Sequence, residues 1–293
     1  MKIPSAHIAK NYYAPLPELQ HRTGDIWRNL SAFGLIHSQN PVSGLVITPA
    51  CDLANNKTPT ITYLPIVSVR TYLSTENGYS LMRSTMSTLL EGQLKRSDLS
   101  ELLERSKIPD ETTLALMEEE IKKNASGHSS IILKRLNAGL SAIRKIRSGD
   151  SSAGSEIKIV LKTDDWKQFC ENIVKNAIFD DVHFLPPEEP IEEWSAISEP
   201  SLVLFRYPIT VPRAMLDMAS SSHEDWPTNL QKLSPFHQLG FKERPLKVTR
   251  LSKEFLSDLL TRFARLYVRI GAPDFSREAV ISLAEKVEGA CRS

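Results

Sequence analysis

Four side chains in this sequence are of types that take part in catalysis. Thr48, Cys51 and Asp52 lie close together in the run Thr48-Pro49-Ala50-Cys51-Asp52-Leu53, and His183 follows much later in the chain. A thiol acts as a nucleophile when a nearby base or cation lowers its pKa, and an imidazole is the usual base. We therefore treat Thr48, Cys51, Asp52 and His183 as candidate catalytic residues around one cleft.

Three of these side chains also have a purely structural interpretation. Free cysteine is among the most buried residue types, so Cys51 is also compatible with a packed position. Asp52 is typical of residues that cap a turn through the backbone. His183 precedes Phe184 and Leu185, as a histidine in the core or at a strand edge would. Both interpretations stay open at this point.

Two groups of basic residues are candidates for binding. Arg262, Arg265 and Arg269 fall on one face of an expected helix, where they could reach phosphate or an acidic protein. Asp258 lies on the same face, which is also typical of a solvated surface with internal ion pairs. A second basic face on the helix expected over 129–147 would consist of Lys134, Arg135, Arg144 and Lys145.

Several well-defined functional motifs are missing from the sequence. It contains no GxxxxGK[ST] loop, no GxGxxG, no HExxH and no GxSxG. Its 7 histidines and 3 cysteines do not recur at metal-ligand intervals. These observations argue against a P-loop ATPase, an α/β-hydrolase and a metalloenzyme, and we expect no cofactor and no metal.

Composition and charge favour a cytoplasmic protein. The chain of 293 residues has 36 Lys and Arg against 35 Asp and Glu, for a formal charge of +1. A neutral chain is not attracted as a whole to nucleic acid or to anionic lipid, so any such binding must come from a local patch. No run approaches the roughly 18 apolar residues of a membrane span, and the first residues lack the apolar core of a signal peptide.

Hydrophobic periodicity predicts an α+β protein. The expected strands are 24–27, 44–48, 60–69, 157–161, 182–185, 201–207 and 246–251, with a loop over 49–57. Pro65 makes the middle of 60–69 an edge, a bulge or a break between two strands. The expected helices lie within 81–150 and over 164–175, 252–270 and 276–289, while 148–155 reads as a linker and 219–244 as a long loop. These elements suggest a discontinuous β-rich core over 1–80 and 155–251, a helical insertion and linker over 81–154, and a helical pair over 252–293.

Residues 24–66 carry a resemblance to a known family. Gly24-Asp25-Ile26-Trp27, then Gly44-Leu45-Val46-Ile47-Thr48, then the run from Asn55 to Ile66 is similar to the opening of the MazF/PemK-type toxins. The resemblance implies an SH3-like antiparallel β-barrel and, in the toxins, a usually dimeric endoribonuclease that cleaves single-stranded RNA. The family's catalytic Ser or Thr corresponds to Thr48, but Pro41-Val42-Ser43 has no counterpart of its catalytic arginine.

Three functional hypotheses follow. The leading one is a subunit of a bacterial antiviral defence or toxin–antitoxin-like system that binds a protein partner or nucleic acid, in a multiprotein complex or as a homodimer. The first alternative is a metal-independent endoribonuclease that uses Thr48, Cys51, Asp52 and His183. The second is an adaptor without catalytic activity, whose insertion and last two helices bind a partner.

Overall fold

The computed structural model describes most of the chain. The described residues are 12–14, 20–31, 42–92, 94–104, 107–124, 129–188, 195–221, 226, 241 and 243–268. The helix expected over 276–289 and most of the loop expected over 219–244 lie outside them. Within this part of the chain, no helix is both long enough and apolar enough to cross a membrane.

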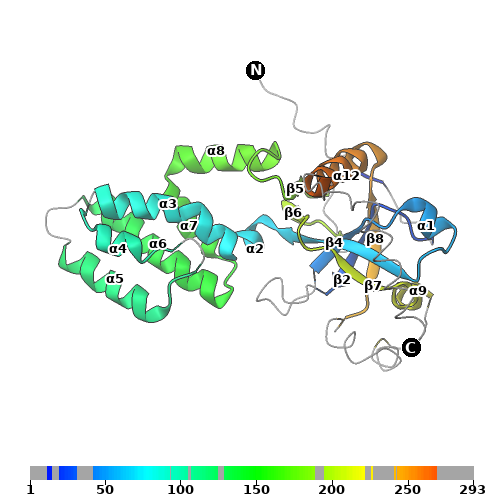
Figure 1. Ribbon diagram of the computed structural model, residues 1–293, viewed down its shortest axis with the longest axis horizontal. Coiled ribbons are helices and arrows are strands. Elements are labelled where there is room, and N and C mark those ends of the chain that lie inside the picture. The colour runs from blue at the N-terminus through cyan, green and yellow to red at the C-terminus, as the bar shows by residue number, and fades with distance from the viewer. Residues whose placement is uncertain are drawn as a thin grey trace, which may run out of the picture.

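Eight strands form one antiparallel sheet (Figure 1). They are β1 (Tyr13–Ala14), β2 (Asp25–Leu30), β3 (Val42–Val46), β4 (Thr60–Ser68), β5 (Val182–Leu185), β6 (Ser201–Leu204), β7 (Ile209–Pro212) and β8 (Leu246–Leu251). Their order is β1-β8-β2-β3-β4-β6-β5, and β7 also pairs with β4.

The sheet curls into a half-barrel. The hydroxyl of Tyr13, on edge strand β1, donates a hydrogen bond of 2.5 Å to the carbonyl of Pro186, just after edge strand β5. The neighbouring Tyr12 hydroxyl donates to the carbonyl of Phe184, at 3.3 Å. Side chains thus bridge the two ends of the strand order, and the expectation of an α+β fold with a curled antiparallel sheet is confirmed.

Of the edge, bulge or break expected at Pro65, the break is wrong, because β4 runs unbroken through that residue. On one side Pro65 pairs with Gly44 of β3. On the other side β4 pairs with β7 over Thr60–Tyr63 and with β6 over Ile66–Ser68. Proline has no N–H to donate, and here it occupies the position where β4 changes partners.

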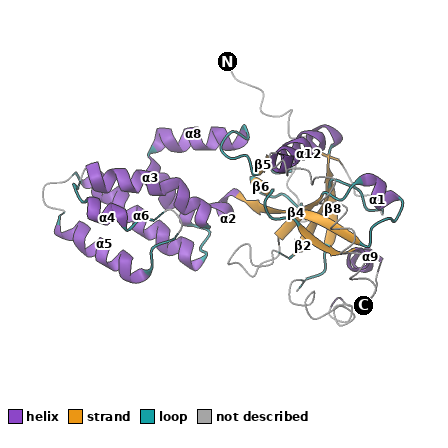
Figure 2. Cartoon of the chain, in the orientation of Figure 1, coloured by secondary structure: helices purple, strands orange, loops and turns teal. Residues whose placement is uncertain are grey.

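Seven helices follow one another between β4 and β5 and make a lobe beside the sheet (Figure 2). They are α2 (Val69–Leu73), α3 (Glu76–Gly92), α4 (Ser97–Glu101), α5 (Glu111–Lys123), α6 (Ser130–Ser148), α7 (Ala153–Leu161) and α8 (Thr163–Val174). The helical expectation over 81–150 and the helix expected over 164–175 are therefore confirmed.

The strand expected over 157–161 and the linker expected over 148–155 are both wrong. Gly149 ends α6 in the left-handed conformation at φ +70°, and α7 begins at Ala153, so the linker is a tight turn. The apolar run is helix α7, with Ile157, Val160 and Leu161 buried in the core of the lobe. A short apolar run does not distinguish a strand from a buried helix by its period.

Three more described helices lie against the sheet: α1 (Ala50–Ala54), α9 (Arg213–Ser221) and α12 (Lys253–Val268). The loop expected over 49–57 is wrong in its first part, because α1 forms there. The helix expected from residue 252 onwards is confirmed as α12, which begins at Lys253. Short helix α9 follows strand β7 directly. The periodicity of the sequence predicted neither β7 nor α9.

Successive residues of the strands point to opposite faces of the sheet and feed two separate cores. Trp27, Val46 and Tyr63 pack with Met215 of α9. Their neighbours Ile26, Leu45 and Leu64 pack with Leu259 of α12. The two helices thus cover different faces, and the segments that lead into them meet at one end of the sheet.

Candidate functional site

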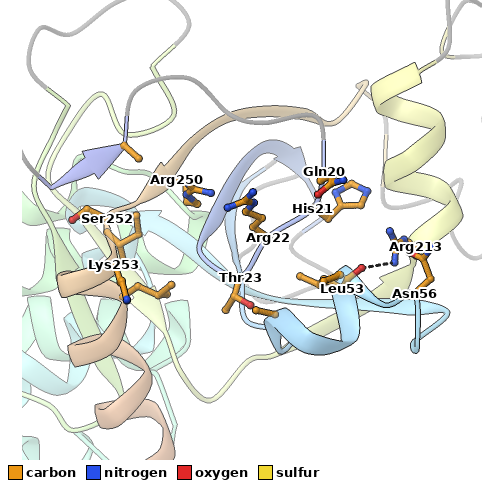
Figure 3. A pocket seen from close by; sticks show the side chains of 15 residues that line it. Gln20, His21, Arg22, Thr23, Leu53, Asn56, Arg213, Arg250, Ser252 and Lys253 are labelled. Atoms are coloured by element: carbon orange, nitrogen blue, oxygen red, sulfur yellow. Dashed lines mark hydrogen bonds between the residues drawn. The ribbon is translucent and has the colours of Figure 1, made fainter.

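A cleft of about 810 Å³ opens at this end of the sheet (Figure 3). Five described segments line it: Ala14 of β1, residues 20–23 before β2, helix α1 with Asn56, the start of α9, and the junction of β8 with α12. These segments are far apart in the sequence. Only the curl of the sheet brings them together.

The cleft is lined by positive charge. Arg22, Arg213, Arg250 and Lys253 are among the fifteen described residues that line it, and these fifteen include no Asp and no Glu. Figure 3 shows Lys253 at the α12 end of the cleft and Arg213 at the α9 end. A concave site lined by one sign of charge concentrates the field and attracts counter-ions. The cleft is therefore suited to an anionic ligand.

Arg213 is held between two helices. Its Nη1 donates a hydrogen bond of 3.2 Å to the carbonyl of Leu53 in α1, and its Nε lies 3.6 Å from Oδ2 of Asp217 in α9. These contacts fix α1 against α9. They also place a guanidinium at the rim of the cleft.

The turn that carries Arg22 is anchored by a buried ion pair. Lys247 Nζ lies 3.3 Å from Oδ2 of Asp25, and the two side chains are only 7% and 2% exposed. Asp25 also accepts the backbone N–H of Arg22 at 2.8 Å, and Lys247 donates to the carbonyl of Gln20 at 2.8 Å. Burial raises the pKa of Asp25, although the charge of Lys247 opposes the shift.

His21 and Asp217 form a hydrogen-bonded pair at the cleft. His21 Nε2 lies 2.7 Å from Asp217 Oδ1, the His21 side chain is 3% exposed, and its Nδ1 is buried without a partner. Burial lowers the pKa of His21 from 6.5, which outweighs the opposing effect of Asp217. In neutral His21 the carboxylate requires the proton on Nε2, so Nδ1 keeps its lone pair. A histidine oriented in this way by a carboxylate is a common general base.

Thr48, one of the expected catalytic residues, connects strands. Its hydroxyl accepts the backbone N–H of Thr62 at 2.7 Å, and its carbonyl accepts the hydroxyl of Thr23 at 2.6 Å. The side chain is buried and does not line the cleft. These two bonds fix the end of β3 against β4 and against the turn before β2.

Cys51 and Asp52 lie together on α1. The Cys51 thiol is exposed and lies 3.6 Å from Oδ1 of Asp52. Neither residue lines the cleft, although Ala50 and Leu53 on either side do. The pair is thus at the surface next to the cleft.

His183 lies elsewhere, on edge strand β5. It is 2% exposed, its Nε2 is 3.3 Å from the Tyr12 hydroxyl, and its ring stacks on Phe205 with the centroids 6.4 Å apart. Burial lowers the pKa of His183 to about 4. The structure therefore brings Cys51 and Asp52 together but does not bring His183 to them.

The expected basic faces have specific local partners. Arg262 Nη2 donates to the carbonyl of Asn176 at 3.0 Å, Arg265 is exposed, and Arg269 lies outside the described residues. The second face is not formed. Arg135 is buried and donates to the carbonyl of Val160, and Arg144 and Lys145 are paired with glutamates of α5 and α7.

The sequence reasoning missed the residues of the cleft. Arg22 adjoins the expected first strand and Arg250 lies within the last one, so both stood at strand ends where a site can form. Asp217 and Arg213 lie on helix α9, which the periodicity did not predict, so nothing in the sequence indicated that these two side chains face a common site. Within the described ranges, no group of three or more His, Cys, Asp or Glu is placed to hold a metal ion.

Comparison with known proteins adds no relative from which a role could be transferred. No protein-family model, no curated protein and no solved structure matches the chain.

Proposed function

We propose that this protein binds the phosphate backbone of single-stranded RNA in the cleft. The observation that carries the proposal is the lining of the cleft: the residues that the structure describes there include Arg22, Arg213, Arg250 and Lys253 but no carboxylate. Arg22 and Lys253 are exposed, and the other two are half-buried at the walls. Phosphate contacts from Arg and Lys supply most of the affinity of proteins that bind nucleic acid without sequence preference.

The size of the cleft favours a single strand. Its volume of about 810 Å³ lies in the range of about 300–1,000 Å³ typical of sites that enclose one small molecule, which corresponds to one or two nucleotides. A concave site of this size admits a strand but not the broad surface of a duplex or the patch of about 800 Å² that a folded protein partner normally covers.

The remaining lining residues indicate which parts of a strand are contacted. The described lining residues include no Phe, Tyr or Trp, and the ring of His21 is buried, so we do not expect base stacking to be the main mode of binding. Gln20, Thr23, Asn56 and Ser252 add neutral hydrogen-bonding groups that suit sugar hydroxyls, including the 2′-OH that distinguishes RNA. We therefore expect RNA to bind with little base preference.

The wider role in a bacterial defence or toxin-like system is part of the same proposal. The resemblance of residues 24–66 to the MazF/PemK-type toxins supports it, together with the curled antiparallel sheet to which these residues contribute β2, β3 and most of β4. We propose on the same grounds that the half-barrel is SH3-like.

RNA cleavage is a second candidate function, and the His21–Asp217 pair favours it. In the free protein Nδ1 of His21 is buried, so the turn over residues 20–23 would have to move before this atom accepts the proton of a 2′-OH while the 2′-oxygen attacks the adjacent phosphorus. The bond from phosphorus to the 5′-oxygen would then break, with a proton from water on the leaving oxygen. The products are a 2′,3′-cyclic phosphate and a 5′-OH, and Arg22 and Arg250 would stabilise the negative charge on the non-bridging phosphate oxygens.

Binding is tested by fluorescence anisotropy with a labelled single-stranded RNA of mixed sequence and with the same sequence as a duplex. We expect the single strand to bind more tightly than the duplex. Arg22→Ala should weaken binding at least tenfold, whereas Lys134→Ala, which removes an exposed cation of the helical lobe, should not. Equal loss in both variants, or no binding of single strands, would refute the proposal.

A further inference from the structure

Helix α8 carries an apolar stripe that its own chain leaves at the surface. Trp166, Cys170 and Val174 recur at every fourth position, so they lie along one side of the helix. Trp166 is half-buried, Cys170 is exposed, and Val174 is 57% exposed. The adjacent face, with Phe169 and Ile173, is buried in the core of the lobe.

The position of α8 leaves this stripe accessible. Figure 1 shows α8 along the outer edge of the helical lobe. Its main packing partner among the described elements is α7, the helix that directly precedes it. The apolar surface thus continues from the core of the lobe out to the stripe.

Charged residues beside the stripe have an arrangement that complements itself. Lys167 and Glu171 are both exposed and lie one residue beyond Trp166 and Cys170, on the same flank. At the ends of the helix, Asp164 and Asp165 lie in the first turn, and Lys175 follows the last residue. On the flank, the positive charge of Lys167 lies in the N-terminal half of the helix and the negative charge of Glu171 in the C-terminal half. At the helix ends the order is reversed, with acidic residues first and a lysine last.

Two α8 helices in antiparallel orientation would match the apolar stripe and the charges at the two ends of the helix. With Cys170 at the two-fold axis, Trp166 lies opposite the partner's Val174. Lys167 lies near the partner's Glu171, and the two Glu171 side chains, each 3.4 Å from Lys175 of its own chain, also lie near each other across the axis. The acidic first turn then comes near the partner's Lys175. A parallel pair would instead place like charges together. We infer that α8 is a self-association surface through which a second copy of this chain binds, antiparallel, with the two Cys170 side chains near the two-fold axis.

The size of the surface sets the expected strength. Helix α8 has 12 residues and is therefore about 18 Å long. A pair of such helices buries well below the roughly 1,200 Å² at which standard interfaces begin, so the dimer should be weak, with a Kd in the range of about 1–100 μM. This surface is independent of the cleft and lies in a segment that the toxin resemblance does not cover.

Sedimentation velocity of the full chain from about 1 to about 200 μM tests this inference. The wild-type protein should shift from monomer to dimer with concentration. Val174→Glu, which places a charge in the stripe, should remain monomeric. Leu116→Glu is the matched control, because Leu116 is 49% exposed on α5 and lies outside the stripe. Its association should equal that of the wild type.

A charge exchange tests the orientation of the two helices. Lys167→Glu should weaken dimerisation, because it opposes the partner's Glu171 with a second acid. The double variant Lys167→Glu/Glu171→Lys should restore it, since an antiparallel pair would again oppose unlike charges. In a Cys51→Ser/Cys291→Ser background, a short bismaleimide should link two copies through Cys170.

Three results would overturn the inference. The first is a protein that stays monomeric over the whole concentration range. The second is a dimer that survives Val174→Glu, which would place the contact elsewhere. The third is a dimer that does not regain its affinity in the double variant Lys167→Glu/Glu171→Lys, or one in which the bismaleimide does not link the two copies through Cys170.

Discussion

His21 Nε2 lies 2.7 Å from Asp217 Oδ1, although the two residues are 196 positions apart in the sequence. The contact joins the segment that enters β2 to helix α9, which follows β7. Arg213, also on α9, reaches across to the carbonyl of Leu53 on α1. The His21–Asp217 and Arg213–Leu53 contacts thus close one side of the cleft. The cationic residues that line the cleft come together because the sheet is curled.

His21 should be required for cleavage but not for binding. His21→Gln removes a basic imidazole and adds no charge, so RNA affinity should change less than about threefold. Any cleavage by the wild-type protein should be lost, as measured by gel electrophoresis of labelled RNA and detection of a 2′,3′-cyclic phosphate. Cleavage that continues in the variant would refute the assignment of His21 while leaving the binding proposal intact.

The pH dependence of cleavage follows from the direction of the His21 shift. Because the pKa of His21 lies below 6.5, the imidazole is neutral and able to accept a proton at pH 7. The rate should therefore be constant above pH 6.5 and fall only at lower pH. A rate that already falls between pH 8 and pH 7 would contradict the neutral state of His21.

Removal of Lys247 should destabilise the fold. Lys247→Met leaves the carboxylate of Asp25, 2% exposed, without its ion pair, which should cost about 3–5 kcal/mol in urea unfolding. The matched control is Arg70→Gln, because the pair of Arg70 with Glu199 is exposed on both sides and should contribute less than about 1 kcal/mol. Equal losses in the two variants would show that the buried pair has no special role.

His183 should make stability depend on pH. Its folded pKa of about 4 lies below the unfolded value of 6.5, so the unfolded chain binds the proton first as pH falls. The contribution of His183 to the free energy of unfolding is fully present above pH 6.5. It is lost as the pH falls from 6.5 to 4, and the total loss is about 3 kcal/mol.

Urea unfolding at pH 7 and pH 4.5 measures the contribution of His183. Carboxylates also titrate in this window, so the quantity to compare is the difference between the wild type and His183→Gln. The variant should lose clearly less stability on acidification. An identical loss would mean that His183 is not buried in its neutral form.

Replacement of Lys162 by glycine should stabilise the protein, because the backbone conformation at position 162 suits glycine better than lysine. Lys162 joins α7 to α8 at φ +68° and ψ 166°, a region that essentially only glycine adopts without strain. Lys162→Gly should therefore stabilise the protein by about 1 kcal/mol in thermal unfolding. In the interior of α6, Lys134→Gly should instead destabilise it by about 1 kcal/mol. Destabilisation by both changes would contradict the strained junction.

Periodicity was sufficient for much of the fold. Alternating and helical patterns located the strands around Ile26, Leu45 and Leu64 and the helix that contains Leu259, because each of these residues faces one core. The prediction of a strand over 157–161 was wrong, because a helix that is buried on most sides has the same composition as a buried strand. The effect of Pro65 could only be given as an edge, a bulge or a break, because it depends on the change of partner strand, which no local pattern shows.

The site was beyond the reach of local patterns. The adjacency of Cys51 and Asp52 suggested chemistry, yet α1 turns both away from the cleft that it helps to line. His183 lacked any sequence signal for its partner, because Tyr12 reaches it from the opposite edge of the sheet. The cations that line the cleft come from three separate segments, namely the turn before β2, the start of α9 and the junction of β8 with α12, and only tertiary structure brings them together.

The salt dependence of RNA binding tests the central claim most directly. If the four cations of the cleft meet phosphates, the logarithm of the association constant should fall with the logarithm of salt concentration with a slope of about −3, since each contact contributes about −0.7. Arg22→Ala should reduce the magnitude of the slope by about 0.7 without changing the thermal stability of the protein. A slope near zero, or a slope that is the same in Arg22→Ala, would contradict the assignment of the cleft as the phosphate-binding site.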